Sequence, residues 1–375
     1  MGSAIARYVD TAAGLDHVVE NVARASSVAV DTEFVRERTY YPRLCLIQLA
    51  VDDMIWCVDP IALDDLGTLY EALSAPGCSK IFHAARQDLE IFYHAHSDVP
   101  APLFDTQIAA ALLGRPDQIA YAGLVAELCG VDLDKSSSRT DWSRRPLSTR
   151  QLDYAADDVR YLGSMQQQLE QELVASGRIA WFEEECQRLT EPTLYSAEPA
   201  DAWQRLKGLE KLSETEFARA VALAEWREVT AKARDLPRGW ILKDDRLLAL
   251  AREAPRTLSA LGDTTGISPG LVRRYGATLL DLLNSRVPRE PLPPPTKPRL
   301  SATGKKLLDR LLRELGELCR DLGVSTSLVA TRREMEMAVG RRTGIRLYEG
   351  WREALFGAYV RAEVEAAHSA AVLCV

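Results

Sequence analysis

The first half of the chain alternates between short apolar runs and segments with helical periodicity. Four apolar runs predict β-strands, at residues 28–34, 44–51, 54–58 and 80–83. Apolar residues at helical spacing predict helices over residues 15–25 and 66–73. Only Asp52 and Asp53 separate the second run from the third, so these two runs predict an antiparallel hairpin. Strands that alternate with helices and include a hairpin predict an α/β fold with a mixed sheet.

The remainder of the chain is helical in pattern and is divided by prolines. A helical connector is expected after Arg160, and residues 201–286 predict helices throughout. Pro288 to Pro298 contains six prolines in eleven residues, which is typical of a semi-rigid extended spacer. Four segments are therefore predicted: an α/β domain over residues 1–190, a helical domain over 200–286, a linker over 287–298 and a second helical domain over 299–368. The two helical domains align weakly with each other, as a diverged repeat would.

Four acidic side chains and one tyrosine stand at positions that suggest a metal site. Asp31 and Glu33 lie two residues apart on the first predicted strand, so their side chains share one face. Asp88 follows the fourth predicted strand, at the start of a predicted helix. Tyr154 and Asp158 are at positions i and i+4 of another predicted helix and also share a face. Because carboxylates at a buried strand end repel each other and lose solvation, a divalent cation between them is the simplest remedy.

The order and spacing of these residues resemble the ribonuclease D family, 3′→5′ exonucleases of the tyrosine-bearing branch of the DEDD superfamily. The first family motif falls on Asp31-Thr32-Glu33-Phe34, the second on Asp88-Leu89 and the third on Tyr154 and Asp158. The resemblance implies a ribonuclease H-like exonuclease domain that releases nucleoside 5′-monophosphates from RNA 3′ ends. It also implies structured RNA, such as tRNA precursors, as the substrate.

The resemblance further implies a role for each motif residue. Asp31 would bridge two divalent cations, Glu33 and Asp158 would hold the cation that carries the attacking water, and Asp88 would support the other cation through solvent. Oxygen ligands favour Mg²⁺ or Mn²⁺. Tyr154 would orient or deprotonate the water, and orientation is favoured because a phenol with a pKa of about 10 is a poor base at neutral pH. Asp157 could replace Asp158, but the i+4 spacing of the family favours Asp158.

Several further residues are candidates for contacts with the substrate. The resemblance implies that Thr32 and Phe34 contact the terminal nucleotide. His83 is expected either near the scissile phosphate or in a structural role. Basic residues that could hold the RNA backbone, or could equally be solvated surface charges, are Arg36, Lys135, Arg139, Arg144 and Arg145.

The net charge of −8 is unevenly distributed along the chain. Residues 1–160 contain 14 lysines and arginines against 24 aspartates and glutamates, whereas residues 299–362 contain 13 against 8. An acidic first half suits a site that concentrates cations, and a basic C-terminal segment can contact phosphates. An Arg-rich helical domain without that role remains the alternative.

The first helical domain resembles an HRDC domain, a small helical module shared by helicases and ribonuclease D. The second resembles a diverged copy around Trp351 and Arg352. Such modules are implied to help hold nucleic acid. Trp203, Trp226 and Trp351 are expected in helical cores rather than in base-stacking positions.

The composition predicts a cytoplasmic protein that functions without a membrane or an obligate protein partner. No apolar stretch approaches the roughly 20 residues of a membrane span, and seven scattered cysteines suggest a reducing compartment. Two alternatives share the same residues: a 3′→5′ DNA exonuclease, and a nucleic-acid-binding protein with a silent nuclease fold. The silent protein would require the loss of a ligand residue, and none is missing from the motifs.

Overall fold

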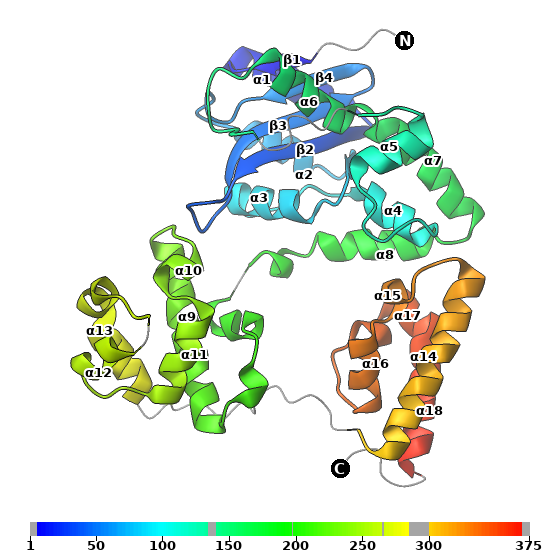
Figure 1. Cartoon of the computed structure of the whole chain (residues 1–375). Coiled ribbons are helices and arrows are strands. Elements are labelled where there is room, and N and C mark those ends of the chain that lie inside the picture. Colours follow the sequence, from blue (N-terminus) through cyan, green and yellow to red (C-terminus); the bar gives the residue numbers. More distant parts are fainter. Residues whose placement is uncertain (1–5, 134–139, 197, 265, 285–299, 370–375) are drawn as a thin grey trace. The chain divides into compact units, whose positions relative to one another are not determined.

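The computed structural model describes residues 6–133, 140–196, 198–264, 266–284 and 300–369 (Figure 1). The chain forms two compact units. The sheet unit comprises Met1–Val35, Leu44–Tyr195 and Pro298–Val375, and the helical unit comprises Arg36–Arg43 and Ser196–Lys297. No helix in the described ranges is long and apolar enough to span a membrane.

A six-stranded sheet forms the centre of the sheet unit, in the order β1-β4-β3-β2-β5-β6. Its strands are β1 (Arg7–Val9), β2 (Ser27–Val35), β3 (Arg43–Val51), β4 (Met54–Val58), β5 (Ser79–Phe82) and β6 (Leu103–Asp105). β3 and β4 form the predicted antiparallel hairpin, with Ile47 opposite Val58. β1 pairs with β4, β2 with β5 and β5 with β6 in parallel. The prediction of a mixed sheet is thus confirmed. The pattern missed β1 and β6, because three residues are too few to give an alternation.

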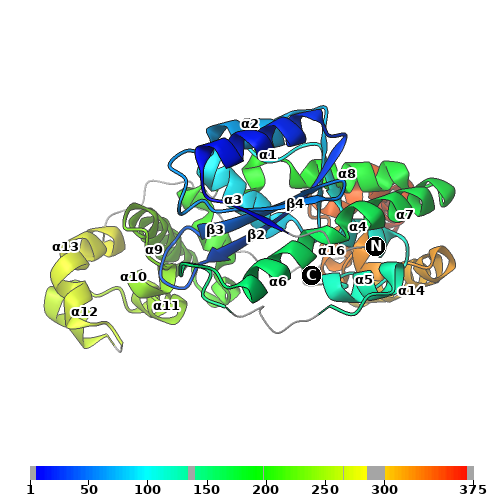
Figure 2. The same ribbon diagram turned by 90° about the horizontal axis from the view of Figure 1, so that it is seen from above.

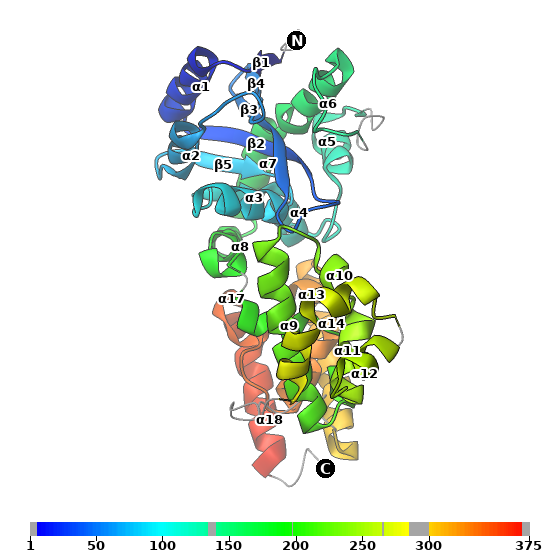
Figure 3. The ribbon, with the colours of Figure 1, turned by 90° about the vertical axis from the view of Figure 1, so that its left-hand side faces the viewer.

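Helices cover both faces of the sheet (Figures 2 and 3). On one face lie α1 (Ala12–Arg24), α2 (Gly67–Ser74) and α3 (Arg86–His96), and on the other lies α6 (Thr149–Arg160). The unit also contains α4 (Thr106–Leu112), α5 (Tyr121–Cys129), α7 (Leu162–Ala175) and α8 (Ile179–Leu189). Val18 and Val22 of α1 pack in the same apolar cluster as Val28 and Val30 of β2. This burial of β2 from the α1 side fixes the strand that carries Asp31 and Glu33.

The C-terminal helices belong to the sheet unit. They are α14 (Ala302–Leu322), α15 (Thr326–Val329), α16 (Arg332–Val339), α17 (Gly350–Arg352) and α18 (Ala358–Ser369). Trp351 stacks on Trp181 of α8, with ring centroids 4.6 Å apart and an interplanar angle of 14°. The fully buried Arg352 forms an ion pair with Glu185 of α8 and donates to the carbonyl of Leu328 at 2.9 Å.

This packing places the basic C-terminal helices in the same compact unit as the acidic α/β domain. The two segments share one apolar core. Trp351 was expected in a helical core and is buried, but its ring partner comes from the α/β domain. The stacking partner lies far away in sequence, so no local pattern could identify it.

The helical unit is built around a long helix, α9 (Glu214–Ala233). The other helices are α10 (Arg238–Ile241), α11 (Asp244–Glu253), α12 (Leu258–Asp263) and α13 (Pro269–Asn284). α9 begins with a capping box between Ser213 and Glu216, which ties two backbone N–H groups at its start. Phe217, Leu250 and Leu279 lie in the apolar core of the helical unit. Trp203 and Trp226 pack against that core, as expected.

The loop between β2 and β3 folds with the helical unit. The backbone N–H groups of Tyr40 and Tyr41 donate to Asp235 at 3.0 and 3.1 Å. The hydroxyl of Tyr40 donates to Glu228, and the guanidinium of Arg238 lies 4.8 Å from the centre of the Tyr40 ring. The domain division predicted from the sequence placed this loop in the α/β domain. Contacts between residues nearly two hundred positions apart leave no local signal in the sequence, so the pattern could not reveal them.

Candidate active site

Three carboxylates from two elements converge in the sheet unit. Asp31 and Glu33 extend from β2 and Asp158 extends from α6, and one oxygen of each lies within 4.8 Å of the others. The buried run Val28–Val30 fixes β2 in the sheet, and Ala155, Ala156 and Val159 form the buried face of α6. Ser148 and Gln151 form a capping box that sets the start of α6. Alternation places Asp31 and Glu33 on one face of β2, and the packing of α6 against β2 brings Asp158 to them.

Asp88 lies next to this group, on the first turn of α3. It is 7% exposed, and one of its oxygens accepts a hydrogen bond from the hydroxyl of Thr32 at 2.5 Å. Its charge raises the pKa of both Asp31 and Glu33. Because the Thr32 hydroxyl is occupied by Asp88, the contact of Thr32 with a nucleotide expected from the sequence would have to use its main chain.

The carboxylates carry pKa values far above those of ordinary side chains. Burial, with the charges of Asp158 and Asp88, raises the pKa of Glu33 to about 8. Burial and the charge of Asp157 raise the pKa of Asp158 to about 7. Burial and then the charges of Asp88, Asp158 and Glu33 raise the pKa of Asp31 well above its usual range. In folded metal-free protein, negative charge is therefore unfavourable at each of these positions.

This donor set fits a hard divalent cation. All three donors are carboxylate oxygens, the ligand type that Mg²⁺ and Mn²⁺ prefer. Within the described part of the chain, no lysine, arginine or histidine forms an ion pair with any of them. A cation would therefore supply the positive charge that the surrounding side chains do not.

Tyr154 precedes Asp158 by one helical turn. Its ring lies 6.2 Å from that of Trp142, centre to centre, and is half-buried. Burial and the charges of Asp158, Glu33 and Asp31 raise the pKa of its hydroxyl further above the usual value. In the metal-free protein the hydroxyl is therefore protonated at neutral pH and can donate a hydrogen bond.

Asp157, the neighbour of Asp158 in sequence, has a different environment. The carboxylate of Asp157 accepts a hydrogen bond from Arg160 at 2.7 Å, and its main-chain oxygen accepts one from Tyr121, also at 2.7 Å. Asp158, and not Asp157, joins the group of three carboxylates, as the i+4 spacing predicted.

His83 has a structural position in this fold. Its Nδ1 lies 2.9 Å from the hydroxyl of Thr106, and its Nε2 lies 2.9 Å from the carbonyl oxygen of Ile119. Burial lowers the pKa of the ring, so the imidazole is neutral at neutral pH and Nε2 carries the proton donated to Ile119. Both ring nitrogens already have protein partners, which favours the structural role of the two that were expected.

The basic residues predicted to contact the substrate, and Phe34, lie in different environments. Arg145 is structural, because it forms an ion pair with the buried Asp59 at 2.5 Å and donates to the carbonyl of Cys45 at 2.6 Å. Arg144 is exposed and pairs with Asp141 at 3.1 Å. Phe34 is half-exposed on β2, next to Glu33. Arg36 is exposed and belongs to the helical unit, while Lys135 and Arg139 lie outside the described residues.

Sequence reasoning missed Asp105, which organises the turn before α3. This buried carboxylate accepts hydrogen bonds from the backbone N–H groups of Ala84 and Ala85 at 3.1 and 2.8 Å. It also caps α4 by accepting from Gln107 at 2.8 Å. Ala84 has a positive φ of 60°, a conformation that such bonds help to hold. An aspartate that follows a short apolar run and precedes a helix is a typical N-cap signal, and this one could have been found.

Comparisons with known proteins agree with this site. Residues 6–174 match a family model described as 3'-5' exonuclease, and residues 216–283 match the model of the HRDC domain. Ribonuclease D of Sphingobium indicum is 40% identical over 344 residues, covering 90% of this chain and 88% of that protein. Ribonuclease D of Gluconacetobacter diazotrophicus is 37% identical over 356 residues, covering 93% and 90%.

A solved structure extends the similarity to the whole fold. The crystal structure of Escherichia coli RNase D, described as an exoribonuclease involved in structured RNA processing, matches with a TM-score of 0.87 and 33% sequence identity. The match covers 96% of this chain and 98% of that one. With relatives matched over nearly their full length and an acidic group formed by the exonuclease motifs, the chain belongs to the ribonuclease D family of 3′→5′ exoribonucleases.

Proposed function

We propose that Asp31, Glu33, Asp88 and Asp158 form a binding site for two divalent cations, Mg²⁺ or Mn²⁺, and that Tyr154 orients the attacking water. The observation that carries this proposal is the convergence of three desolvated carboxylates without a basic partner among the described residues. When bound, such cations would activate a water molecule and stabilise the departing 3′-oxygen.

The protein groups then have distinct tasks. Asp31 lies in the group of three carboxylates, its pKa is raised by Asp88, Asp158 and Glu33, and it is proposed to contact both cations. Thr32 holds Asp88 in place through its hydroxyl. Asp88 is proposed to support the second cation through solvent. The protonated phenol of Tyr154 can align a water by donating a hydrogen bond, which requires no change in its protonation.

We propose structured RNA with a free 3′ end, such as a tRNA precursor, as the substrate. The description of the Escherichia coli relative as an enzyme of structured RNA processing supports this choice. Thr32, Phe34, Arg36, Lys135 and Arg144 remain the proposed contacts with the RNA. A cytoplasmic location is proposed because the six described cysteines are all free thiols.

The domain division is proposed in the form that the sequence suggested, apart from the loop over residues 36–43. The exonuclease domain covers residues 1–190, the HRDC domain lies within 200–286 and the linker covers 287–298. Residues 299–368 would be a second, diverged HRDC-like domain that has become part of the sheet unit.

The test uses purified protein on matched RNA and DNA of the same sequence, labelled at the 5′ end. With Mg²⁺ or Mn²⁺, RNA should shorten stepwise from its 3′ end and release nucleoside 5′-monophosphates, and excess EDTA should stop the reaction. Asp158→Asn should nearly abolish turnover, whereas Asp157→Asn, one residue away, should keep most of it. Tyr154→Phe should lower kcat on the order of 10²-fold with little change in KM.

Three results would contradict the proposal. Full turnover in EDTA would exclude the cations. Greater loss from Asp157→Asn than from Asp158→Asn would show that the wrong carboxylate has been assigned. A Tyr154→Phe effect confined to KM would reassign the tyrosine to substrate packing.

A further inference from the structure

The junction between α6 and α7 follows closely after Asp158. Tyr161 separates the two helices, and Asp158 lies in the last turn of α6. In one continuous helix, the N–H of Tyr161 would bond to the carbonyl of Asp157. Here the backbone acceptor of that N–H is the carbonyl of Val159, so the carbonyl of Asp157 is open to a donor from elsewhere in the fold. The end of α6 therefore depends on what this carbonyl bonds to.

Tyr121, the first residue of α5, supplies this donor. Its hydroxyl donates to the carbonyl of Asp157 at 2.7 Å. Burial and the charge of Asp158 raise the pKa of the hydroxyl well above its usual value, whereas a hydrogen bond from the backbone N–H of Tyr161 lowers it. The phenol oxygen thus interacts with both backbone groups that would bond to each other in a continuous helix. A side chain that inserts into the backbone ladder in this way bends or breaks a helix.

The peptide group that Tyr121 holds is the one that joins Asp157 to Asp158. Because a peptide group is planar, a bond that fixes its carbonyl oxygen also fixes the N and Cα atoms of Asp158. Asp158 lies in the last turn of α6, where carbonyl groups have no partner within the helix and the backbone tends to fray. A donor from outside the helix therefore keeps this carboxylate beside the other two of the group.

Tyr121 is itself held in place by the sheet. The carbonyl of Ile119 accepts from Nε2 of His83 at 2.9 Å and from the side chain of Gln107 at 3.0 Å. The ring of Tyr121 packs edge-on against the imidazole of His83, with centroids 5.6 Å apart and an interplanar angle of 65°. His83 directly follows β5, and α5 also packs against α7 (Figure 1). Tyr121 therefore has a fixed position from which it can hold the end of α6.

We propose that Tyr121 is a positioning residue for the metal site: its hydroxyl fixes the last turn of α6 and so holds the carboxylate of Asp158 in the geometry that binds a cation. This rests on the proposed function, in which Asp158 and Glu33 hold one of two cations. The hydroxyl proton of Tyr121 is engaged with a main-chain oxygen. Tyr121 therefore acts through the helix and not through contact with the RNA.

The experiment compares the full-length wild type with Tyr121→Phe and Tyr8→Phe. Tyr121→Phe removes the hydroxyl and keeps the ring that packs on His83. Tyr8→Phe is the matched control, because Tyr8 is partly buried in the same unit and its hydroxyl donates to Asp59, a carboxylate outside the metal site. Isothermal titration calorimetry measures Mn²⁺ binding without RNA. Turnover of a short single-stranded RNA is measured over a range of Mg²⁺ concentrations, and Tm is measured in EDTA to verify the fold.

Tyr121→Phe should bind Mn²⁺ about tenfold more weakly, because the loss of a group that orients a metal ligand typically costs about 10- to 100-fold in metal affinity. Its kcat should fall at limiting Mg²⁺ and recover in excess Mg²⁺, with little change in KM for the RNA. Tyr8→Phe should lower Tm in EDTA at least as much as Tyr121→Phe does, but it should leave the affinity for Mn²⁺ unchanged.

Wild-type affinity for Mn²⁺ in the folded Tyr121→Phe protein would overturn the proposal. Equal weakening of Mn²⁺ binding in Tyr8→Phe would also overturn it, because a general loss of stability would then explain the effect. A loss of turnover confined to KM would make Tyr121 a contact of the RNA instead. Failure of the proposed function is recognised separately, because the wild-type protein would then bind no Mn²⁺ or would hydrolyse RNA at its full rate in EDTA.

Discussion

At the scale of single residues, burial of each ionised carboxylate in this group costs free energy that the rest of the fold must offset. The pKa of Glu33 is raised to about 8 and those of Asp88 and Asp158 to about 7, in each case first by burial. These groups ionise near pH 4 in an unfolded chain. The metal-free native state therefore binds protons more tightly than the unfolded state does. Stability and metal binding are thus linked through the same side chains.

The sign of this linkage gives a pH dependence. Because the folded pKa values are raised, the stabilisation from these groups is complete below the unfolded value of about 4. It is lost as the pH rises through about 7 to 8. A bound cation removes this loss, so saturating Mg²⁺ should raise Tm much more at pH 8 than at pH 5. Thermal melts with Mg²⁺ or with EDTA at both pH values measure the difference. An equal Mg²⁺ effect at the two pH values would contradict the linkage.

Asp31→Asn should separate stability from activity. The amide keeps the shape of the carboxylate but removes one charge from a group in which every charge is unfavourable without metal. In EDTA at pH 8, the variant should melt a few degrees above the wild type, although hydrolysis should be abolished. Calorimetry in EDTA and a turnover assay in Mg²⁺ measure the two effects. Asp153→Asn, which removes a charge at an exposed position of α6, is a control that should not raise Tm. A lower Tm for Asp31→Asn would mean that its carboxylate contributes a net favourable interaction.

At the scale of elements, the site depends on how helices start. α6 begins at the Ser148–Gln151 capping box, and the turn before α3 is held by Asp105. α3 carries Asp88 on its first turn, so a change in the turn shifts that carboxylate. The position of a helix start therefore affects the geometry of the site as directly as the identity of its ligands.

Asp105→Ala should destabilise the protein by about 2–4 kcal/mol, because a helix cap is lost and buried backbone N–H groups lose their acceptor. It should also lower kcat, because α3 would no longer hold Asp88 in one position. Thr257→Ala removes an ordinary cap in the helical unit, where Thr257 accepts from Ala260 at 3.2 Å, and should cost about 1 kcal/mol without loss of turnover. Urea unfolding and turnover measured on both variants test this. Wild-type kcat in a folded Asp105→Ala protein would remove Asp105 from the positioning of Asp88.

At the scale of the whole molecule, the order of segments along the chain differs from their grouping into compact units. The C-terminal helices pack on α8 and the loop over residues 36–43 folds with the helical unit, so each unit is built from separate stretches of chain. The Pro-rich linker over residues 287–298 connects the two units in sequence. Removal of a stretch that looks like a terminal domain therefore exposes the core of the catalytic unit.

Truncation after Val287 should consequently destabilise the exonuclease. It uncovers Trp181 and leaves Glu185 without Arg352, which holds the pKa of that carboxyl below its usual value against the effect of burial. The truncated protein should show a lower Tm and a tendency to aggregate, and turnover even of short single strands should fall. Insertion of a Gly-Ser segment into the linker is the control, because each doubling of linker length costs only about 0.6 kcal/mol. An unchanged Tm after truncation would show that the C-terminal helices are an independent domain.

The sequence by itself determined the local elements and the spacing of the ligands. Strand alternation places Asp31 and Glu33 on one face, and the helical turn aligns Tyr154 with Asp158, because both periods are set by backbone geometry over a few residues. Their resemblance to the ribonuclease D motifs identified the family before any contact was known. The mixed sheet followed from the hairpin between β3 and β4, whose connection is short enough to be visible locally.

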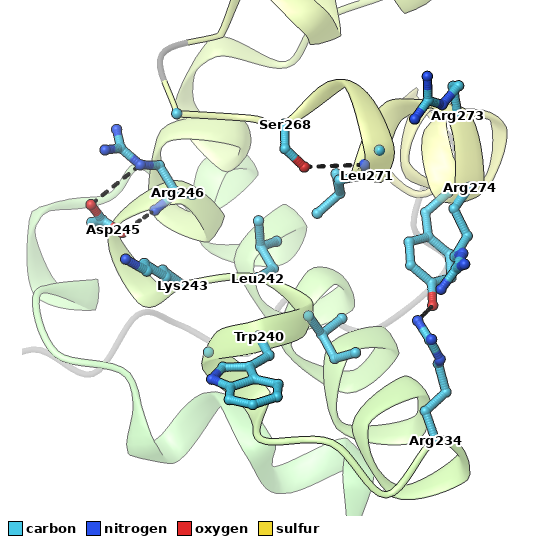
Figure 4. Close-up of a pocket in the computed structure, with 15 residues that line it drawn as sticks. Arg234, Trp240, Leu242, Lys243, Asp245, Arg246, Ser268, Leu271, Arg273 and Arg274 are labelled. Carbon is cyan, nitrogen blue, oxygen red and sulfur yellow. Dashed lines mark hydrogen bonds and ion pairs between the residues drawn. The ribbon is translucent and has the colours of Figure 1, made fainter. Parts of the chain in front are cut away.

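Only the tertiary structure decided what these residues touch. In the folded chain Thr32 is hydrogen-bonded to Asp88, 56 residues away in sequence. Arg145 is hydrogen-bonded to Asp59, 86 residues away, and Tyr40 to Glu228, 188 residues away. Both ring nitrogens of His83 have protein partners, and the C-terminal helices pack on α8. Trp240 is exposed at a pocket lined by basic residues (Figure 4). The physical reason is the same in each case. Hydrogen-bond partners, burial and pKa shifts depend on groups that are near in space and distant in sequence, whereas a sequence pattern reports only the residues within a few turns of the backbone.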